Sequence, residues 1–249
     1  MRRFLKRLRG VGAGLVLGAV LAAGMAAAAA TDAASGGGYP PPRAAVGRLE
    51  GPAGRACTGV LVAPRQVLTA AHCVHDPETR RRLAPDTLRF FAGRRGAGFT
   101  AAADVAEIQV PAAYRYDPTP ASLTAARFDV ALLRLTAALD VPPLALAPAD
   151  VMPARFEAIG YTHYLPQRQS KQHACSRIEG PLDGRHAVPA GLWATTCFAF
   201  PGVSGAPLLT EAQPPAVLGI VIAHAYRAAI AVPVSVVHRA FAETLFSKS

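Results

Sequence analysis

Short apolar runs separated by turn residues extend through most of the chain. Nine segments are rich in Val, Ile, Leu, Phe and Ala and are bounded by Gly, Pro or charged residues, which is the pattern of β-strands. They are residues 58–63, 66–71, 87–92, 104–110, 129–135, 155–160, 206–210, 216–223 and 229–234. No long helical periodicity interrupts them between Val46 and Pro233. Many short strands at close spacing predict an all-β barrel or sandwich.

The last part of the chain follows a different period. Between residues 234 and 246 the apolar residues recur at helical spacing, as Val236, Val237, Ala240, Phe241 and Leu245. This spacing predicts one C-terminal amphipathic helix that packs against the strands.

The N-terminus has the layout of an export signal. Five basic residues within the first nine positions precede an apolar stretch from Val11 and the small residues Ala28 to Ala30. Residues 1–30 are therefore predicted to be a signal peptide cleaved near Ala30, which makes the protein secreted or periplasmic. The alternative is an uncleaved anchor over residues 11–30, although few Leu residues make this a weak stop-transfer segment. We expect no stable membrane association after cleavage.

Residues 31–43, TDAASGGGYPPPR, are rich in Gly and Pro and predict a flexible linker or a short pro-segment. The length that remains, residues 44–249, suits one larger all-β domain or two small barrels that share an interface.

The net charge adds little evidence on the class of function. The chain carries +10, from 26 basic and 16 acidic residues, and five of those ten charges belong to the export signal. The arginine runs at 78–83 and 90–95 are typical of solvated loops, and no aromatic residues interleave with them in the manner of a nucleic-acid site. We expect no nucleic-acid partner.

Four cysteines, Cys57, Cys73, Cys175 and Cys197, follow the predicted export signal. An even number in an exported protein favours disulfides. Three pairings are possible and the sequence alone cannot choose between them, although local spacing favours Cys57–Cys73 and Cys175–Cys197. The chain has no CxxC pair, so we expect no metal site.

Three residues have the chemistry of nucleophilic catalysis. The stretch LTAAHCV ends a predicted strand with His72 next to Cys73, Asp129 opens another predicted strand, and Ser204 lies in GVSGAP. A serine hydroxyl needs a base to take its proton, histidine suits that role near neutral pH, and a carboxylate fixes the histidine tautomer. The backbone N–H groups of Gly202 and Ser204 are the expected oxyanion donors, because glycine permits the backbone angles that converge amides on one point. This chemistry needs no cofactor.

Each of these residues also has an alternative interpretation. His72 could be an ordinary buried or surface histidine, Asp129 a turn cap and Ser204 a turn serine. His75 with Asp76 could begin a metal site, but without further ligands we expect a solvated loop histidine. The remaining histidines His163, His173, His186 and His238 have no distinctive setting.

The segments TGVLVAPRQVLTAAHCV, FDVALLRL and GVSGAPLL, in this order, resemble the chymotrypsin-type (trypsin-like) serine proteases, and most closely their bacterial glutamyl-endopeptidase-like branch. The resemblance extends from Val46 to the C-terminal helix. It implies two antiparallel six-stranded β-barrels that meet near residues 136–152, with the active site in the cleft between them and a C-terminal α-helix. A disulfide Cys57–Cys73 would match the one that the family has beside its catalytic histidine.

By this resemblance, His72 is the general base, Asp129 its orienting carboxylate and Ser204 the nucleophile. The implied activity is that of an exported, monomeric serine endopeptidase, which hydrolyses peptide or protein substrates through an acyl-enzyme. The alternative is a binding module that holds peptides without cleaving them, since a fold alone does not guarantee activity.

Val203 departs from the family pattern. In the digestive relatives an aspartate at this position forms an ion pair with a newly cleaved N-terminus and so orders the oxyanion loop. The family's Arg-Ile-Val-Gly-Gly start is missing as well, since the chain reads Arg43-Ala44-Ala45-Val46-Gly47. Both halves of the switch are absent together, which predicts a complete triad with another mode of activation.

The resemblance also places the residues of the first specificity pocket. Its floor falls on Phe198, flanked by Ala199, and its wall on the strand that carries His224. An acidic floor is absent, so cleavage after Arg or Lys is not expected. His224 could narrow the pocket, bind an acidic side chain or point to solvent, so the expected substrate side chain is small and apolar, or acidic.

Overall fold

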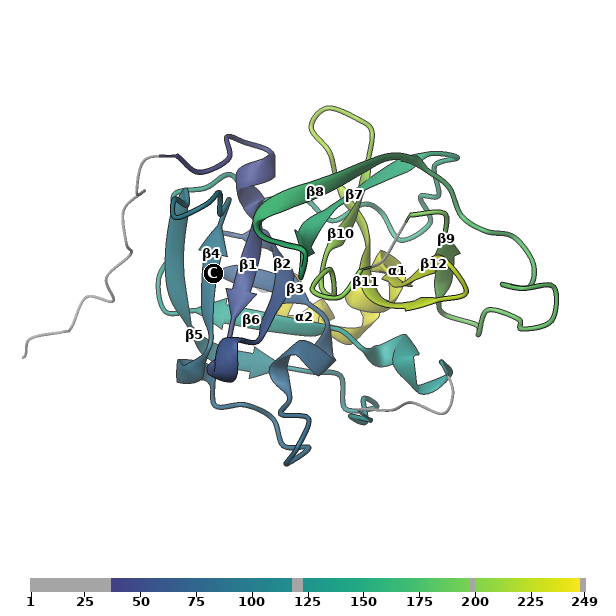
Figure 1. Ribbon diagram of the computed structural model, residues 1–249, viewed down its shortest axis with the longest axis horizontal. Helices are drawn as coiled ribbons and strands as arrows, with labels where there is room; N and C mark the ends of the chain where they lie inside the picture. Colours follow the sequence, from purple (N-terminus) through teal and green to yellow (C-terminus); the bar gives the residue numbers. More distant parts are fainter. Residues whose placement is uncertain (1–36, 118–122, 198–199, 247–249) are drawn as a thin grey trace, which may run out of the picture.

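The computed structural model describes residues 37–117, 123–197 and 200–246, and its strands form two units that lie side by side (Figure 1). The first unit contains β1 (Val46–Glu50), β2 (Ala56–Ala63), β3 (Gln66–Thr69), β4 (Arg89–Ala92), β5 (Ala101–Gln109) and β6 (Ala131–Leu135). These six strands close into an antiparallel barrel in the order β1-β2-β3-β6-β5-β4.

The second unit contains β7 (Phe156–Thr162), β8 (Leu165–Cys175), β9 (Trp193–Thr195), β10 (Pro207–Thr210), β11 (Val217–Ala225) and β12 (Ala228–Pro233). They form one antiparallel sheet in the order β8-β7-β10-β11-β12-β9. The segment after β8 returns to the other edge strand, because Arg177 bridges Thr195 and a disulfide joins Cys175 to Cys197. The sheet therefore curls until its two edges meet, which gives the second barrel that the sequence implies.

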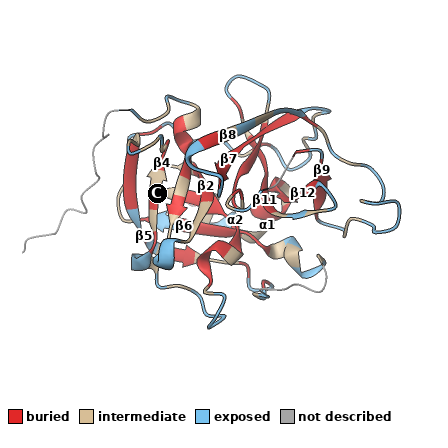
Figure 2. Cartoon of the chain, viewed as in Figure 1, coloured by how far each residue is buried: buried red, intermediate tan, exposed pale blue. Residues whose placement is uncertain are grey.

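Apolar residues form the core of each unit. Buried residues, drawn in red, lie along the strands of both units (Figure 2). Leu61, Leu68 and Phe90 are fully buried in the first barrel, and Phe156 and Leu208 in the second unit. Full burial of one such side chain stabilises the fold by roughly 1.5–3 kcal/mol. The two units are also in contact with each other, where β1 and β2 lie against β7.

All nine predicted strands are present, with ends that differ by a few residues, whereas β1, β8 and β9 have no counterpart among the predicted strands. The largest omission is β8, whose sequence LPQRQSKQHAC is almost entirely polar. Only Gln169 and Cys175 are buried in it, because the other face of this edge strand is directed to solvent. Hydrophobic periodicity cannot identify a strand that buries so few apolar side chains.

The C-terminal helix is present but divided. α1 (Val234–Ala240) and α2 (Ala242–Phe246) are separated at Phe241, whose φ of −127° is not helical. α1 packs against β11 and β12 of the second unit, whereas the carbonyl of Thr244 in α2 accepts a hydrogen bond from Gln66 of the first barrel. The two helices together therefore join both units. Short 3-10 helices occupy Arg43–Ala45, Pro52–Gly54, Ala71–Val74, Pro85–Thr87 and Ala125–Phe128.

The segment before β1 also contacts both units. The N–H of Tyr39 donates to the carbonyl of Gly93 in the first barrel, at 2.9 Å. Arg43 Nε donates to Gln169 Oε1 of β8, and Gln169 Nε2 donates back to the Arg43 carbonyl, both at 2.9 Å. Residues 39–43, the end of the segment interpreted above as a linker or pro-segment, are thus bound to the domain.

None of the described helices is long and apolar enough to cross a membrane. The proposed signal at 1–30 and the alternative anchor at 11–30 lie outside the described residues.

Candidate active site

His72 and Asp129 are brought together by the register of two neighbouring strands. β3 pairs with β6 in antiparallel orientation, with Thr69 opposite Ala131. Because the end of one strand faces the start of the other, the residues that follow β3 and precede β6 lie at the same end of the barrel. His72 is in the 3-10 turn after β3, and Asp129 immediately follows the turn before β6.

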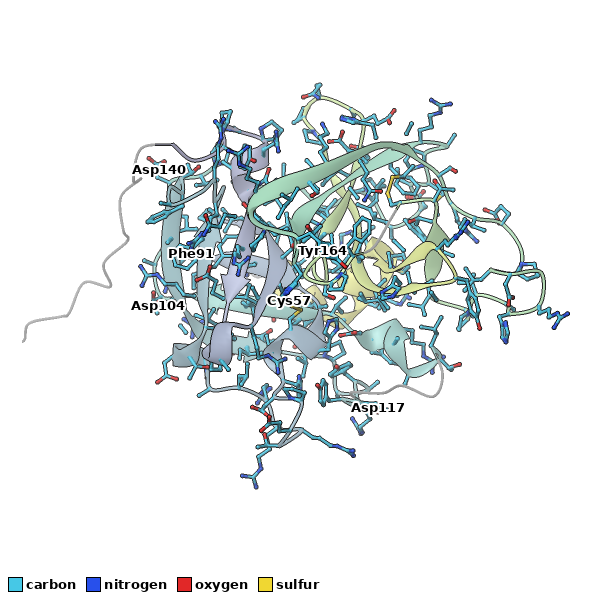
Figure 3. All side chains as sticks on the ribbon, in the orientation of Figure 1. Cys57, Phe91, Asp104, Asp117, Asp140 and Tyr164 are labelled. Atoms are coloured by element: carbon cyan, nitrogen blue, oxygen red, sulfur yellow. A yellow bond between two sulfur atoms is a disulfide. The ribbon has the colours of Figure 1, made fainter. Side chains whose placement is uncertain are left out.

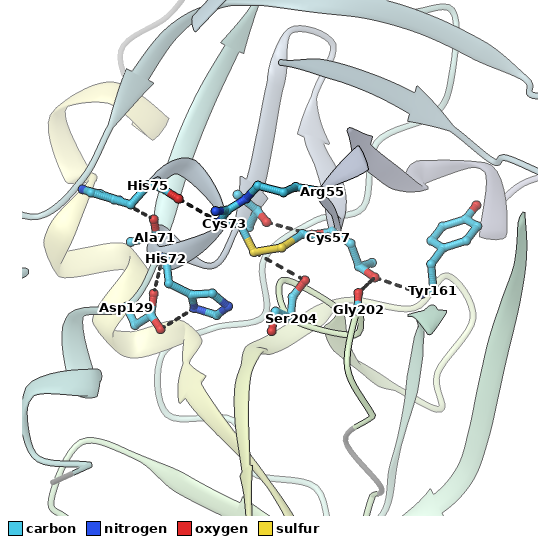
Figure 4. The surroundings of a disulfide bond; sticks show 12 residues. Arg55, Cys57, Ala71, His72, Cys73, His75, Asp129, Tyr161, Gly202 and Ser204 are labelled. Carbon is cyan, nitrogen blue, oxygen red and sulfur yellow. Dashed lines mark hydrogen bonds and ion pairs between the residues drawn. A yellow bond between two sulfur atoms is a disulfide. The ribbon is translucent and has the colours of Figure 1, made fainter. Parts of the chain in front are cut away.

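The carboxylate of Asp129 binds His72 at two points (Figure 4). Asp129 Oδ1 accepts the backbone N–H of His72 at 2.8 Å, and Oδ2 lies 2.7 Å from the ring nitrogen Nδ1. A carboxylate can only accept, so the neutral ring carries its proton on Nδ1 and leaves the lone pair of Nε2 available. His72 is therefore held in the tautomer that a general base requires.

The pKa of His72 lies above the ordinary histidine value. Burial and the charge of Arg55 each lower it, but the charge of Asp129 and its hydrogen bond to the ring outweigh them. The site thus favours the protonated imidazole, which is the form that histidine takes after it has removed a proton from a nucleophile.

Ser204 reaches the same place from the second unit. Its backbone carbonyl accepts the N–H of Thr58 on β2 at 2.8 Å and lies 3.9 Å from the sulfur of Cys73, next to His72. In Figure 4 the Ser204 side chain lies beside the His72 ring, on the side opposite Asp129. No hydrogen bond joins Ser204 to His72 in the described part of the chain, and such bonds are often long before substrate binds.

Two consecutive tight turns shape the loop that carries Ser204. The N–H of Val203 donates to the carbonyl of Phe200 at 3.1 Å, and the N–H of Ala206 donates to the carbonyl of Val203 at 2.8 Å. Each turn has a glycine at its third position, Gly202 with φ +92° and Gly205 with φ +86°. Only glycine adopts these angles readily, and a Cβ on Gly205 would lie 1.9 Å from the Thr58 carbonyl oxygen.

The hydrogen bonds of the loop determine the direction of two backbone amides. The Pro201 carbonyl accepts the N–H of His163 at 2.6 Å, and the Val203 carbonyl accepts the N–H of Ala206. In a trans peptide the N–H points opposite to the carbonyl. The N–H groups of Gly202 and Ser204 are thereby turned away from these partners, and neither donates to an acceptor among the described residues. Two unpaired amides beside the serine are what an oxyanion site requires.

Val203 packs where the digestive relatives have an aspartate. Its side chain is 7% exposed and belongs to the core of the second unit, together with Phe156, Leu208 and Val221. The loop is therefore anchored by apolar burial at the position where those relatives use an ion pair.

The disulfide Cys57–Cys73 lies beside His72, as the family resemblance implies, and in Figure 3 Cys57 lies near the middle of the molecule, between the two units. The sulfurs of Cys57 and Cys73 are close to a nitrogen of His72, an arrangement that could suggest a metal site. Because the sulfurs are bonded to each other, neither is a free thiolate, and this cluster does not fit a metal ion.

The prediction of a solvated His75 is wrong. The side chain is buried, its Nδ1 lies 2.8 Å from the Ala71 carbonyl oxygen, and its ring stacks on Tyr116 with centroids 4.9 Å apart. Burial lowers its pKa, so the neutral form is favoured. His75 packs the segment with Tyr114 and Tyr116 against the turn that holds His72.

A pocket opens next to His72 and Asp129, which form part of its lining. Tyr114, Tyr116 and Ile222 also line it. The sequence analysis did not find Tyr114, Tyr116 or Thr58, because no motif marks them. Of the predicted specificity residues, His224 is exposed near the end of β11, opposite Ala229 of β12. Phe198 and Ala199 lie outside the described residues.

A two-barrel β-fold with a His–Asp pair on one barrel and a serine between glycines on the other defines a class, the chymotrypsin-fold serine proteases. The chain belongs to the trypsin-like peptidase family, because residues 57–220 match the model of the trypsin-like peptidase domain. The fold is similar to that of a Glu endopeptidase solved in complex with MPD, with a TM-score of 0.65 and 19% sequence identity, over 82% of this chain and 93% of that one. No curated protein matches the sequence.

Proposed function

We propose that this trypsin-like peptidase is an exported serine endopeptidase that cleaves peptide bonds through an acyl-enzyme. The observation that carries the proposal is the arrangement of three side chains and two amides from distant parts of the chain. Asp129 binds His72 at 2.7 Å and 2.8 Å, and the loop of Ser204 presents the unpaired N–H groups of Gly202 and Ser204 beside that pair.

In the proposed mechanism the hydroxyl of Ser204 attacks the substrate carbonyl while His72 Nε2 takes the hydroxyl proton. The negative charge that forms on the carbonyl oxygen is stabilised by the N–H groups of Gly202 and Ser204. The imidazolium, stabilised by Asp129, then gives its proton to the leaving amine, which leaves an ester on Ser204. A water molecule, deprotonated by His72, hydrolyses the ester and restores the hydroxyl.

Export is the part of the proposal that the sequence and the disulfides support together. Residues 1–30 have the composition of a signal peptide, and two disulfides fit an oxidising compartment. We propose that the working protein begins between residue 31 and the segment bound to the domain at Tyr39, and that it acts outside the cytoplasm on peptide or protein substrates.

The direct test is labelling with a fluorophosphonate, which reacts with a serine whose base and oxyanion site are assembled. The purified protein should be labelled, and Ser204→Ala should abolish labelling. The control Ser176→Ala should leave labelling unchanged, because it removes a hydroxyl whose partner is the Thr196 hydroxyl, 3.5 Å away. Labelling that persists in Ser204→Ala would assign the nucleophile elsewhere. A folded protein that binds peptides and is never labelled would instead be the non-catalytic binding module.

A further inference from the structure

Thr58 is a fully buried polar residue that forms hydrogen bonds with two residues of the Ser204 loop. Its N–H donates to the carbonyl of Ser204 at 2.8 Å, and its hydroxyl donates to the carbonyl of Gly202 at 3.3 Å. The second bond is longer than the usual O–H···O distance of about 2.8 Å, so it is weaker than average.

The Thr58 hydroxyl also has a partner on β7. The backbone N–H of Tyr161 donates to it at 2.9 Å, which uses one lone pair of the oxygen and leaves its hydrogen for the Gly202 carbonyl. The Thr58 carbonyl in turn accepts the hydroxyl of Thr69 on β3 at 2.7 Å. Thr58 therefore connects β2 and β3 of the first barrel to β7 and to the loop of the second unit.

With the bonds of Thr58, each carbonyl from Pro201 to Ser204 accepts a hydrogen bond. The carbonyls of Pro201 and Val203 are bound by His163 and Ala206, and those of Gly202 and Ser204 are bound by Thr58. Four successive carbonyls are thus held, and the amide that follows each of them has a fixed direction. The Gly202 carbonyl belongs to the peptide that joins the two oxyanion peptides. If it were released, this link could rotate, and the amides of Gly202 and Ser204, each still held by one neighbouring carbonyl, would lose part of their alignment.

We propose that Thr58 is a positioning residue, which sets the oxyanion amides through its hydroxyl and does so without any charged group or newly cleaved N-terminus. The proposal rests on the proposed function of Ser204. In the digestive relatives an ion pair orders this loop; here the hydroxyl of Thr58 and the buried side chain of Val203 take that role.

The test compares Thr58→Val, which keeps the side-chain shape and removes the hydroxyl, with Thr58→Ser, which keeps the hydroxyl. For Thr58→Val we expect kcat for a peptide ester to fall about tenfold to a hundredfold, since loss of one oxyanion donor costs about a hundredfold or more, while KM changes less than about twofold. Thr58→Ser should retain kcat within about threefold, because the hydrogen bonds are kept.

Thr195→Val is the matched control. Thr195, the last residue of β9, is also fully buried, and its hydroxyl donates to the carbonyl of Ala229 on β12 at the same 3.3 Å rather than to the turns around Ser204. The melting temperature of Thr195→Val should fall by an amount similar to that of Thr58→Val, and its kcat should be unchanged. Equal kcat in Thr58→Val and the wild type, or equal losses in Thr58→Val and Thr195→Val, would overturn the proposal.

A second readout is independent of turnover. In a Ser204→Ala background, the Thr58→Val change should shift the NMR amide signal of Gly202 and speed the hydrogen exchange of Val203, whose N–H donates to Phe200 in the peptide that Thr58 holds, at least about tenfold, whereas Thr195→Val should not. This decides the role of Thr58 even if the wild type hydrolyses nothing, an outcome that would refute the proposed function alone. If Thr58→Val does not fold, Thr58→Ala carries the same predictions, because it removes the same hydroxyl and leaves room for water at the Tyr161 N–H.

Discussion

Asp129 controls His72 in three respects at once. Its two oxygens fix the position of the backbone and the tautomer of the ring, and its charge raises the pKa of the imidazole against the effects of burial and Arg55. In the proposed mechanism a neutral His72 is the base, so activity should rise as the pH passes through the pKa of His72. Because that pKa is raised, the rise should occur at a higher pH than for an ordinary histidine.

The substitution Asp129→Asn tests how Asp129 contributes to the tautomer and to the pKa of His72. We expect kcat/KM to fall about 10⁴-fold, because an amide can stabilise the wrong tautomer and does not stabilise the imidazolium. The residual activity should rise at a lower pH than in the wild type, since burial and Arg55 both lower the pKa of His72 once the carboxylate is gone. The measurement is kcat/KM against pH for both proteins, and a rise that stays at the wild-type pH would show that Asp129 does not control this pKa.

At the scale of elements, the loop between β9 and β10 is held by packing and by hydrogen bonds from three different strands or turns. Val203 is buried in the second core, and no charged group is needed to order the two turns around it. A carboxylate at this position, the usual residue in the digestive relatives, would here be buried among apolar side chains.

Val203→Asp should therefore inactivate and destabilise the protein. An unpaired charge in an apolar core costs about 3–5 kcal/mol of the free energy of unfolding, measured by urea denaturation. Val203→Ala, which only shortens the side chain, should cost less than half as much and retain fluorophosphonate labelling. If Val203→Asp were as stable as the wild type, the loop would possess a cationic partner of the kind found in the digestive relatives.

The sequence predicts these elements to different degrees, for physical reasons. The nine identified strands bury alternating or continuous apolar residues, and the motifs of His72, Asp129 and Ser204 lie at their ends. The polar edge strand β8 buries only Gln169 and Cys175, so hydrophobic periodicity does not reveal it, and the role of the buried Thr58 depends on contacts such as the Thr58–Tyr161 bond, which spans 103 residues. No local pattern encodes such contacts, and the burial of His75 by Tyr116 was missed for the same reason.

At the scale of the whole molecule, the units are joined at both ends of the chain. The segment of Tyr39 and Arg43 ties the first barrel to β8, and the C-terminal helices bind β11, β12 and Gln66. In this arrangement the N-terminal segment contributes to stability, and none of the hydrogen bonds of Ser204 within the described residues involves a free amino group.

A chain that begins at Ala44 should therefore melt earlier than one that begins at Gly37, yet still be labelled by a fluorophosphonate. The missing bonds of Tyr39 and Arg43 are worth about 1 kcal/mol each, and 1 kcal/mol shifts the melting temperature by about 2–4 °C at this size. We expect a decrease of about 5–10 °C by calorimetry. Gln169→Leu in the longer chain should reproduce most of it, and loss of labelling without loss of stability would instead indicate an N-terminal switch.

The division of the site between two barrels also determines when the activity can arise during synthesis. The barrel that carries His72 and Asp129 is complete at β6, long before Ser204 is made, and the bonds of Thr58 to Tyr161 and of Arg43 to Gln169 span 103 and 126 residues. Contacts this distant in sequence form late. A nascent or truncated chain thus holds a base without a nucleophile, and proteolysis begins only when the second barrel has docked. For the exported serine endopeptidase proposed above, this order confines the activity to the finished molecule.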